Sequence, residues 1–134
     1  MTVRKIEHVG IMVSSIEASV AFYEQAVGLQ HLETITHTNG VIRLAFLAFP
    51  GASETELELI EGYTGALSAE GRVHHVAFNV DDIEAEFARI GSLSVAGLDE
   101  TLTTLPNGSR YFFFRGPDGE SLEFFQTTRG GSAQ

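Results

Sequence analysis

Ile6-Glu7-His8-Val9-Gly10-Ile11-Met12-Val13-Ser14-Ser15-Ile16-Glu17-Ala18 aligns without gaps on a second stretch of the same chain, Val73-His74-His75-Val76-Ala77-Phe78-Asn79-Val80-Asp81-Asp82-Ile83-Glu84-Ala85. The alignment pairs His8 with His75 and places the two stretches 67 positions apart. Farther along, Leu57-Glu58-Leu59-Ile60-Glu61 resembles Leu122-Glu123-Phe124-Phe125-Gln126, 65 positions apart. Two halves of similar size, each with one His followed by one Glu, indicate a duplicated module.

Each half is predicted to form a strand, a helix and then further strands. Segments 5–13 and 73–80 are rich in Val and Ile and predict the first strands. Helices follow, because apolar residues recur at helical spacing up to Gly28 or Gly91. Ser14 and Asp81 stand at cap-like positions before them. Further strands are predicted at 31–37, 41–49, 54–61, 94–98, 101–105, 109–115 and 120–127, with the Gly-rich segment 62–72 linking the halves.

Side-chain alternation along these strands predicts where the repeated His and Glu residues lie. In a strand, successive side chains point to opposite faces. The apolar faces, such as that of Val9, Ile11 and Val13, are expected to pack against the two helices. The repeated polar residues then lie on the opposite face of one sheet system, where a concave site can form. These residues are His8, Glu58, His75 and Glu123.

Two His and two Glu residues at matched repeat positions predict a metal site. A single strand His is usually structural and a single strand Glu is usually solvated, but four such groups in one cavity would repel or desolvate one another without a cation. Nitrogen and oxygen ligands without sulfur suit one divalent ion, Zn²⁺ or Ni²⁺ first, with Co²⁺, Mn²⁺ or Fe²⁺ as alternatives. The remaining histidines are expected to be strand-end, partner-contacting or surface residues. They are His31, His37 and His74.

Composition narrows the class of protein. The chain has 134 residues, 43% hydrophobic and 19% charged, which fits one globular domain. It contains no Cys, so disulfides, zinc-thiolate sites and cysteine nucleophiles are excluded. The net charge of −10 disfavours nucleic acid and anionic membranes as partners. No apolar run approaches the roughly 18 residues of a membrane span. With no secretory signal expected, the predicted location is the cytoplasm, and the tail 130–134 is predicted to be disordered.

These residues resemble the vicinal oxygen chelate superfamily, which includes glyoxalases, bleomycin resistance proteins and dioxygenases. The resemblance covers residues 4–127 and also includes Ala21-Phe22-Tyr23-Glu24-Gln25-Ala26-Val27-Gly28-Leu29 and Gly116-Pro117-Asp118-Gly119-Glu120-Ser121-Leu122-Glu123-Phe124. It implies an α+β fold in which two paired βαβββ modules, about 4–61 and 72–127, form an open, cup-shaped mixed sheet. It also implies a single domain over 1–134, a homodimer, and His8, Glu58, His75 and Glu123 as metal ligands, within one chain or across the dimer.

Within the superfamily, the His-Glu-His-Glu set looks most like glyoxalase I, lactoylglutathione lyase. That resemblance implies a metal-dependent lyase or isomerase acting on a 2-oxoaldehyde–thiol hemithioacetal, with Glu123 or Glu58 as the base. Two departures count against glutathione as the thiol, because Met12 stands where glyoxalase I has an Arg and Gly62 where it has an Asn. The alternatives are a methylmalonyl-CoA epimerase-like enzyme and a non-enzymatic small-molecule or drug-binding protein of the same fold.

Overall fold

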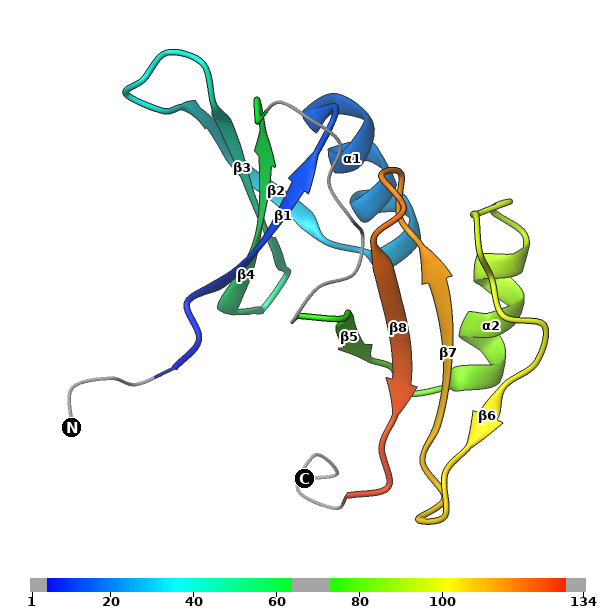
Figure 1. The fold of residues 1–134 in the computed structure, drawn as a ribbon. Coiled ribbons are helices and arrows are strands. Elements are labelled where there is room, and N and C mark those ends of the chain that lie inside the picture. Colours follow the sequence, from blue (N-terminus) through cyan, green and yellow to red (C-terminus); the bar gives the residue numbers. More distant parts are fainter. Residues whose placement is uncertain (1–4, 64–72, 130–134) are drawn as a thin grey trace. The chain divides into compact units, whose positions relative to one another are not determined.

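The computed structural model describes residues 5–63 and 73–129, and the chain divides into two compact units, Met1–Leu67 and Ser68–Gln134. Figure 1 shows the fold of each unit. Most of the predicted linker, residues 64–72, and the tail 130–134 lie outside the described residues. Among the described helices, none has the length and apolar character needed to cross a membrane.

The first unit is a four-stranded mixed sheet with one helical segment. Its elements in chain order are β1 (His8–Val13), α1 (Ile16–Phe22), the π-helical turn η1 (Tyr23–Val27), β2 (Gln30–Thr36), β3 (Arg43–Phe49) and β4 (Ala52–Glu61). The strand order is β1-β4-β3-β2. β1 runs parallel to β4, whereas the other neighbours are antiparallel.

The second unit repeats this topology. Its elements are β5 (Val76–Asn79), α2 (Ile83–Gly91), β6 (Thr103–Thr104), β7 (Arg110–Arg115) and β8 (Ser121–Gln126). The order β5-β8-β7-β6, with β5 parallel to β8, matches the first unit strand for strand. The α+β class with two βαβββ modules is therefore confirmed.

Each helix covers the apolar face of its own sheet. α1 packs on β3 and β4, and α2 packs on β7 and β8. Ile16 and Leu59 are buried in the first unit, as Ile83, Phe112 and Phe124 are in the second. Burying these side chains supplies the main stabilisation of each unit, roughly 1.5–3 kcal/mol for a large apolar side chain. The faces that the alternation pattern assigned to the helices are the faces that the helices cover.

Two predicted strands are largely wrong. Segment 94–98 forms a single bridge, Ala96 to Arg115, because Ser94 (φ 58°) and Gly97 (φ 66°) have left-handed backbone that a strand does not accommodate. Segment 101–105 is a strand only at Thr103–Thr104. Turn chemistry in this region overrides the apolar pattern on which the prediction was based.

Both helix starts, and the end of α2, lie one residue from their predicted positions. Ser15, not Ser14, caps α1 by accepting from the Ala18 N–H. Asp82, not Asp81, caps α2 in the same way. Gly28 (φ 89°) closes η1 as predicted, whereas Gly91 is the last residue of α2 rather than its stop.

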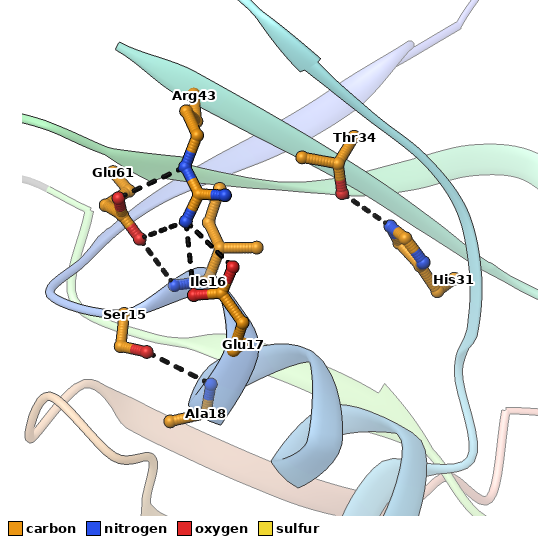
Figure 2. A network of polar contacts seen from close by, with 8 residues as sticks. All are labelled: Ser15, Ile16, Glu17, Ala18, His31, Thr34, Arg43 and Glu61. Atoms are coloured by element: carbon orange, nitrogen blue, oxygen red, sulfur yellow. Dashed lines mark hydrogen bonds and ion pairs between the residues drawn. The ribbon is translucent and has the colours of Figure 1, made fainter. Parts of the chain in front are cut away.

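The last strand of each unit also holds the start of its helix. Glu61 Oε1 accepts the Ile16 N–H at 2.8 Å, and Gln126 Oε1 accepts the Ile83 N–H at 2.8 Å. In the first unit, Arg43 joins this contact by pairing with Glu61 (2.9 Å) and Glu17 (3.0 Å), as Figure 2 shows. The duplicated sequence thus produces a duplicated anchor between helix and sheet.

Candidate metal centre

The first unit brings His8 and Glu58 together across two parallel strands. β1 and β4 pair so that Gly10 lies opposite Glu58, on the face away from α1. His8 Nε2 lies 3.4 Å from Glu58 Oε1. A Cβ on Gly10 would lie 3.3 Å from that oxygen and 3.1 Å from the Ile60 side chain. Glycine at this position therefore avoids crowding the Glu58 carboxylate. This spacing is close enough for both side chains to contact one ion.

The second unit contains the same pair at the equivalent place. His75 Nε2 lies 3.0 Å from Glu123 Oε1, and Ala77 takes the register position of Gly10. The Glu123 side chain is only 8% exposed and that of Glu58 13%. A carboxylate this deep needs a charged or hydrogen-bonding partner to stay ionised, and His75 is the one beside it.

A phenylalanine from the third strand of each module stands beside each pair. Phe46 lies opposite Glu58 in the β3–β4 register, and Phe113 lies opposite Glu123 in the β7–β8 register. The ring of His8 meets Phe46 edge-on at 6.4 Å, and that of His75 meets Phe113 edge-on at 5.0 Å. The sequence reasoning missed these two residues, although their spacing of 67 positions repeats the spacing of the histidines. Apolar walls strengthen the electrostatic interactions of the polar groups beside them.

The electrostatics of the two pairs differ. Burial raises the pKa of Glu123, while the charge and hydrogen bond of His75 act in the opposite direction. The pKa of His8 is raised chiefly by its hydrogen bond to the Glu7 carboxylate, with Glu58 adding to the effect against the opposing effect of burial. Burial thus dominates at Glu123, and a hydrogen bond to a neighbouring carboxylate dominates at His8.

Each candidate ligand histidine has a partner for its other ring nitrogen. His8 Nδ1 donates to Glu7 Oε1 at 2.7 Å. His75 Nδ1 lies 2.9 Å from His74 Nδ1, so one of these atoms donates and the other accepts. β5 begins at Val76, so His74 lies just ahead of the strand, in keeping with the strand-end position expected for it, and it contacts the neighbouring His75.

The other two histidines take part in local contacts, as expected for surface residues. His31 Nε2 lies 2.7 Å from Thr34 Oγ1 on β2, as Figure 2 shows. His37 Nδ1 accepts the Asn39 N–H at 3.1 Å within a turn. Both side chains are exposed. Within residues 5–63 and 73–129, neither forms a hydrogen bond or ion pair with the two His–Glu pairs.

Met12 and Gly62, the two departures from glyoxalase I, both lie next to strand residues of the first unit. Met12 is exposed and lies beside Ile60 in the β1–β4 register. Gly62 has φ 120°, and a Cβ there would lie 3.0 Å from the Val41 carbonyl oxygen. An Asn at position 62 would therefore be strained in this backbone conformation.

The donor chemistry of each pair fits a first-row divalent metal. An unprotonated imidazole nitrogen and a carboxylate oxygen are ligands of Zn²⁺, Ni²⁺ and their neighbours. Each unit supplies two such donors, and within residues 5–63 and 73–129 no group of three or more His, Asp or Glu side chains is gathered in a metal-binding arrangement. The structure joins His8 to Glu58 and His75 to Glu123. That all four bind one ion stays a prediction.

A duplicated βαβββ module with a His–Glu pair on the face of each sheet that its helix does not cover defines a vicinal oxygen chelate type of protein. The family model described as "Glyoxalase/Bleomycin resistance protein/Dioxygenase superfamily" matches residues 5–124, and the chain belongs to this superfamily. The expectation drawn from the sequence motifs is confirmed at the level of the family.

Individual relatives span nearly the whole chain. Protein YwbC of Bacillus subtilis is 54% identical over 123 residues, covering 92% of this chain and 98% of its own. The lactoylglutathione lyase of Haemophilus influenzae is 29% identical over 127 residues, covering 91% and 92%. Among solved structures, the antibiotic binding protein TnmS3 from Streptomyces sp. CB03234 superposes with a TM-score of 0.76 at 25% identity, covering 96% and 99%.

Proposed function

We propose that the protein is a metal-dependent isomerase of the glyoxalase I type, acting on the hemithioacetal of a 2-oxoaldehyde and a thiol. The observation that carries the proposal is the duplicated pair, His8 with Glu58 and His75 with Glu123, each with nitrogen and oxygen atoms within 3.4 Å. Similarity to the Haemophilus influenzae lactoylglutathione lyase across both modules supports it.

The four side chains would together hold one divalent ion, within one chain or across a homodimer. Two neutral imidazoles and two carboxylates would neutralise a dication. When bound, such an ion would stabilise negative charge on two vicinal oxygens of the substrate. Zn²⁺ and Ni²⁺ are the first ions to test.

The carboxylates of Glu123 and Glu58 are the candidates for the proton-transfer step. Isomerisation removes a proton from one carbon of the hemithioacetal and returns it to the adjacent carbon, so one base suffices and no oxidant is needed. The product is a 2-hydroxyacyl thioester. Glu123 is the stronger candidate because it is the more buried, and beside the Phe113 ring its proton is better shielded from exchange with water.

The surroundings of the first pair favour a thiol other than glutathione. Glu56 lies opposite His8 in the β1–β4 register, and Glu7 and Glu58 contact the imidazole directly. Met12 offers an apolar side chain where glyoxalase I has an Arg for a glutathione carboxylate. An anionic thiol would meet unfavourable charge here, and the whole chain carries a net charge of −10.

The likeness to TnmS3 favours a second candidate, a non-enzymatic binder of small molecules. Such a binder needs an apolar cavity but neither a base nor a metal. The two His–Glu pairs argue for the enzyme, because a buried carboxylate beside an imidazole costs stability that a simple binder has no reason to bear.

The deciding experiment combines metal analysis with an activity screen. Protein purified without chelators should contain about one divalent ion per set of four ligands, measured by elemental mass spectrometry. Protein loaded with Zn²⁺ or Ni²⁺ should isomerise methylglyoxal adducts of a panel of neutral, cationic and anionic thiols, followed by thioester absorbance. Epimerisation of an acyl-CoA instead would establish the epimerase alternative, and tight binding without turnover would establish the binder.

A further inference from the structure

The residue immediately before each candidate ligand histidine contacts the nitrogen that faces away from the His–Glu pair. Glu7 precedes His8 and His74 precedes His75, and the two positions align in the repeat at the same offset of 67. Glu7 Oε1 lies 2.7 Å from His8 Nδ1, and His74 Nδ1 lies 2.9 Å from His75 Nδ1. Nε2 of both histidines faces a carboxylate instead, Glu58 or Glu123.

This arrangement assigns separate tasks to the two ring nitrogens. A neutral imidazole has one N–H and one lone pair. If Nε2 gives its lone pair to a metal ion, the remaining N–H is on Nδ1 and needs an acceptor. Glu7 and His74 stand at that acceptor position in the first and second units. Histidines that ligate metals in proteins commonly have such a partner, which fixes the tautomer and the ring orientation.

We propose that Glu7 and His74 are positioning residues of the metal site, each accepting the Nδ1–H of the adjacent ligand histidine. The inference rests on the metal site proposed above and adds which nitrogen binds and what holds it. Nε2 is the ligating atom of both histidines. The two ligands are unequal, because a carboxylate polarises His8 more strongly than a neutral imidazole polarises His75.

The position of these residues before the strands explains how neighbours in sequence can meet. Side chains at i and i+1 inside a strand point to opposite faces. β1 begins at His8 and β5 at Val76, so Glu7, His74 and His75 precede the regular pairing. In the second unit, the rings of His74 and His75 are both edge-on to Phe113, at 6.4 and 5.0 Å, which restricts their rotation.

The test measures Zn²⁺ affinity by competition with a chromophoric chelator, which requires no substrate. His74→Phe keeps a ring beside Phe113 but removes the acceptor, and His74→Asn restores an acceptor near the position of Nδ1. We expect His74→Phe and Glu7→Ala each to weaken Zn²⁺ binding about tenfold to a hundredfold. His74→Asn should stay near the wild-type affinity, and Glu7→Gln should fall between.

Matched controls are available in exposed residues outside the pairs. His31→Phe removes a histidine whose side chain contacts Thr34, and Glu100→Ala removes an exposed carboxylate of the second unit. Neither should change Zn²⁺ affinity. A second readout is the ¹⁵N chemical shifts of the histidine rings in the Zn²⁺-loaded protein, which should show His8 and His75 protonated at Nδ1.

The outcomes separate this inference from the proposed function. Wild-type protein that binds Zn²⁺ with the same affinity as His74→Phe and Glu7→Ala would overturn the positioning role and leave the metal site intact. Ring shifts showing Nδ1 bound to Zn²⁺ would do the same. Wild-type protein that binds no divalent ion would overturn the proposed function and this inference with it.

Discussion

Glu61 Oε1 accepts the backbone N–H of Ile16 at 2.8 Å and so fastens the end of β4 to the first turn of α1. Gln126 holds the equivalent N–H of Ile83 at the same distance, so an acid and an amide do the same task in the two units. The two anchors differ because the Glu61 carboxylate also forms an ion pair with Arg43. Comparing Glu61 with Gln126 therefore allows the contribution of the ion pair to be separated from that of the hydrogen bond.

Glu61→Gln should make the protein less stable at neutral pH but not in acid. Arg43, followed by the Ile16 N–H, lowers the pKa of Glu61 in the folded protein below its usual 4.5. A group with a lowered folded pKa contributes stability above its unfolded pKa and loses it as the pH falls through the folded one. We expect the melting temperature at pH 7 to fall by roughly 2–4 °C. A difference in melting temperature between wild type and Glu61→Gln that persists unchanged at pH 3 would contradict this.

Gln126→Glu should give the second unit an ion pair with Arg110 equivalent to that of Glu61 with Arg43 in the first unit. Arg110 lies opposite Gln126 in the β7–β8 register and already pairs with Glu84 at 2.9 Å, as Arg43 lies opposite Glu61 and pairs with Glu17. The variant should melt a degree or more above wild type at pH 7, about the effect of one partly exposed ion pair, and lose that gain in acid or at high salt. Calorimetry at two pH values and two ionic strengths measures it.

Glu123→Gln should separate catalysis from metal binding. The amide keeps the shape of the side chain and an oxygen donor but cannot act as the base. We expect at least about a hundredfold loss of turnover with most of the metal retained. Glu58→Gln is the matched comparison, with a comparable loss if both carboxylates move the proton and a clearly smaller one if Glu58 only holds metal. Full activity in Glu123→Gln would remove it from the catalytic step.

His75→Ala should lose the metal while the fold survives. The side chain provides one of the four proposed donors and is partly exposed, so its removal leaves no large cavity in the core. Elemental analysis should show less than a tenth of the wild-type metal content under the same conditions. His31→Ala is the control and should retain the wild-type content, since His31 lies on β2 beside Thr34.

The protein should be a homodimer at micromolar concentration. All residues of the edge strand β2 are exposed, with Leu32 at 48% and Ile35 at 43%, and an exposed edge strand with apolar side chains is a surface that a partner covers. Analytical ultracentrifugation should give about twice the chain mass of 14.5 kDa. Sedimentation as a monomer would count against a site shared across two chains.

Most of the fold could be read from the repeat. Period-two alternation in β1, β4 and β8 and helical spacing before Gly28 predicted the elements and their buried faces, because burial of one face leaves a direct pattern in the sequence. The prediction failed between Gly91 and Thr104, where apolar residues sit in turns. Ser94 has a left-handed backbone conformation (φ 58°) that the local sequence pattern did not predict.

The sequence by itself determined the family, the duplicated module and the four candidate His and Glu residues, because a repeat at fixed spacing places equivalent residues on equivalent strand faces. Only the tertiary structure decided what surrounds them. The contacts of Phe46 and Phe113 with the histidines depend on cross-strand register, and those of Glu7 and His74 depend on where each strand begins. Register and strand ends arise from hydrogen bonding between segments far apart in the chain, so a local pattern cannot specify them.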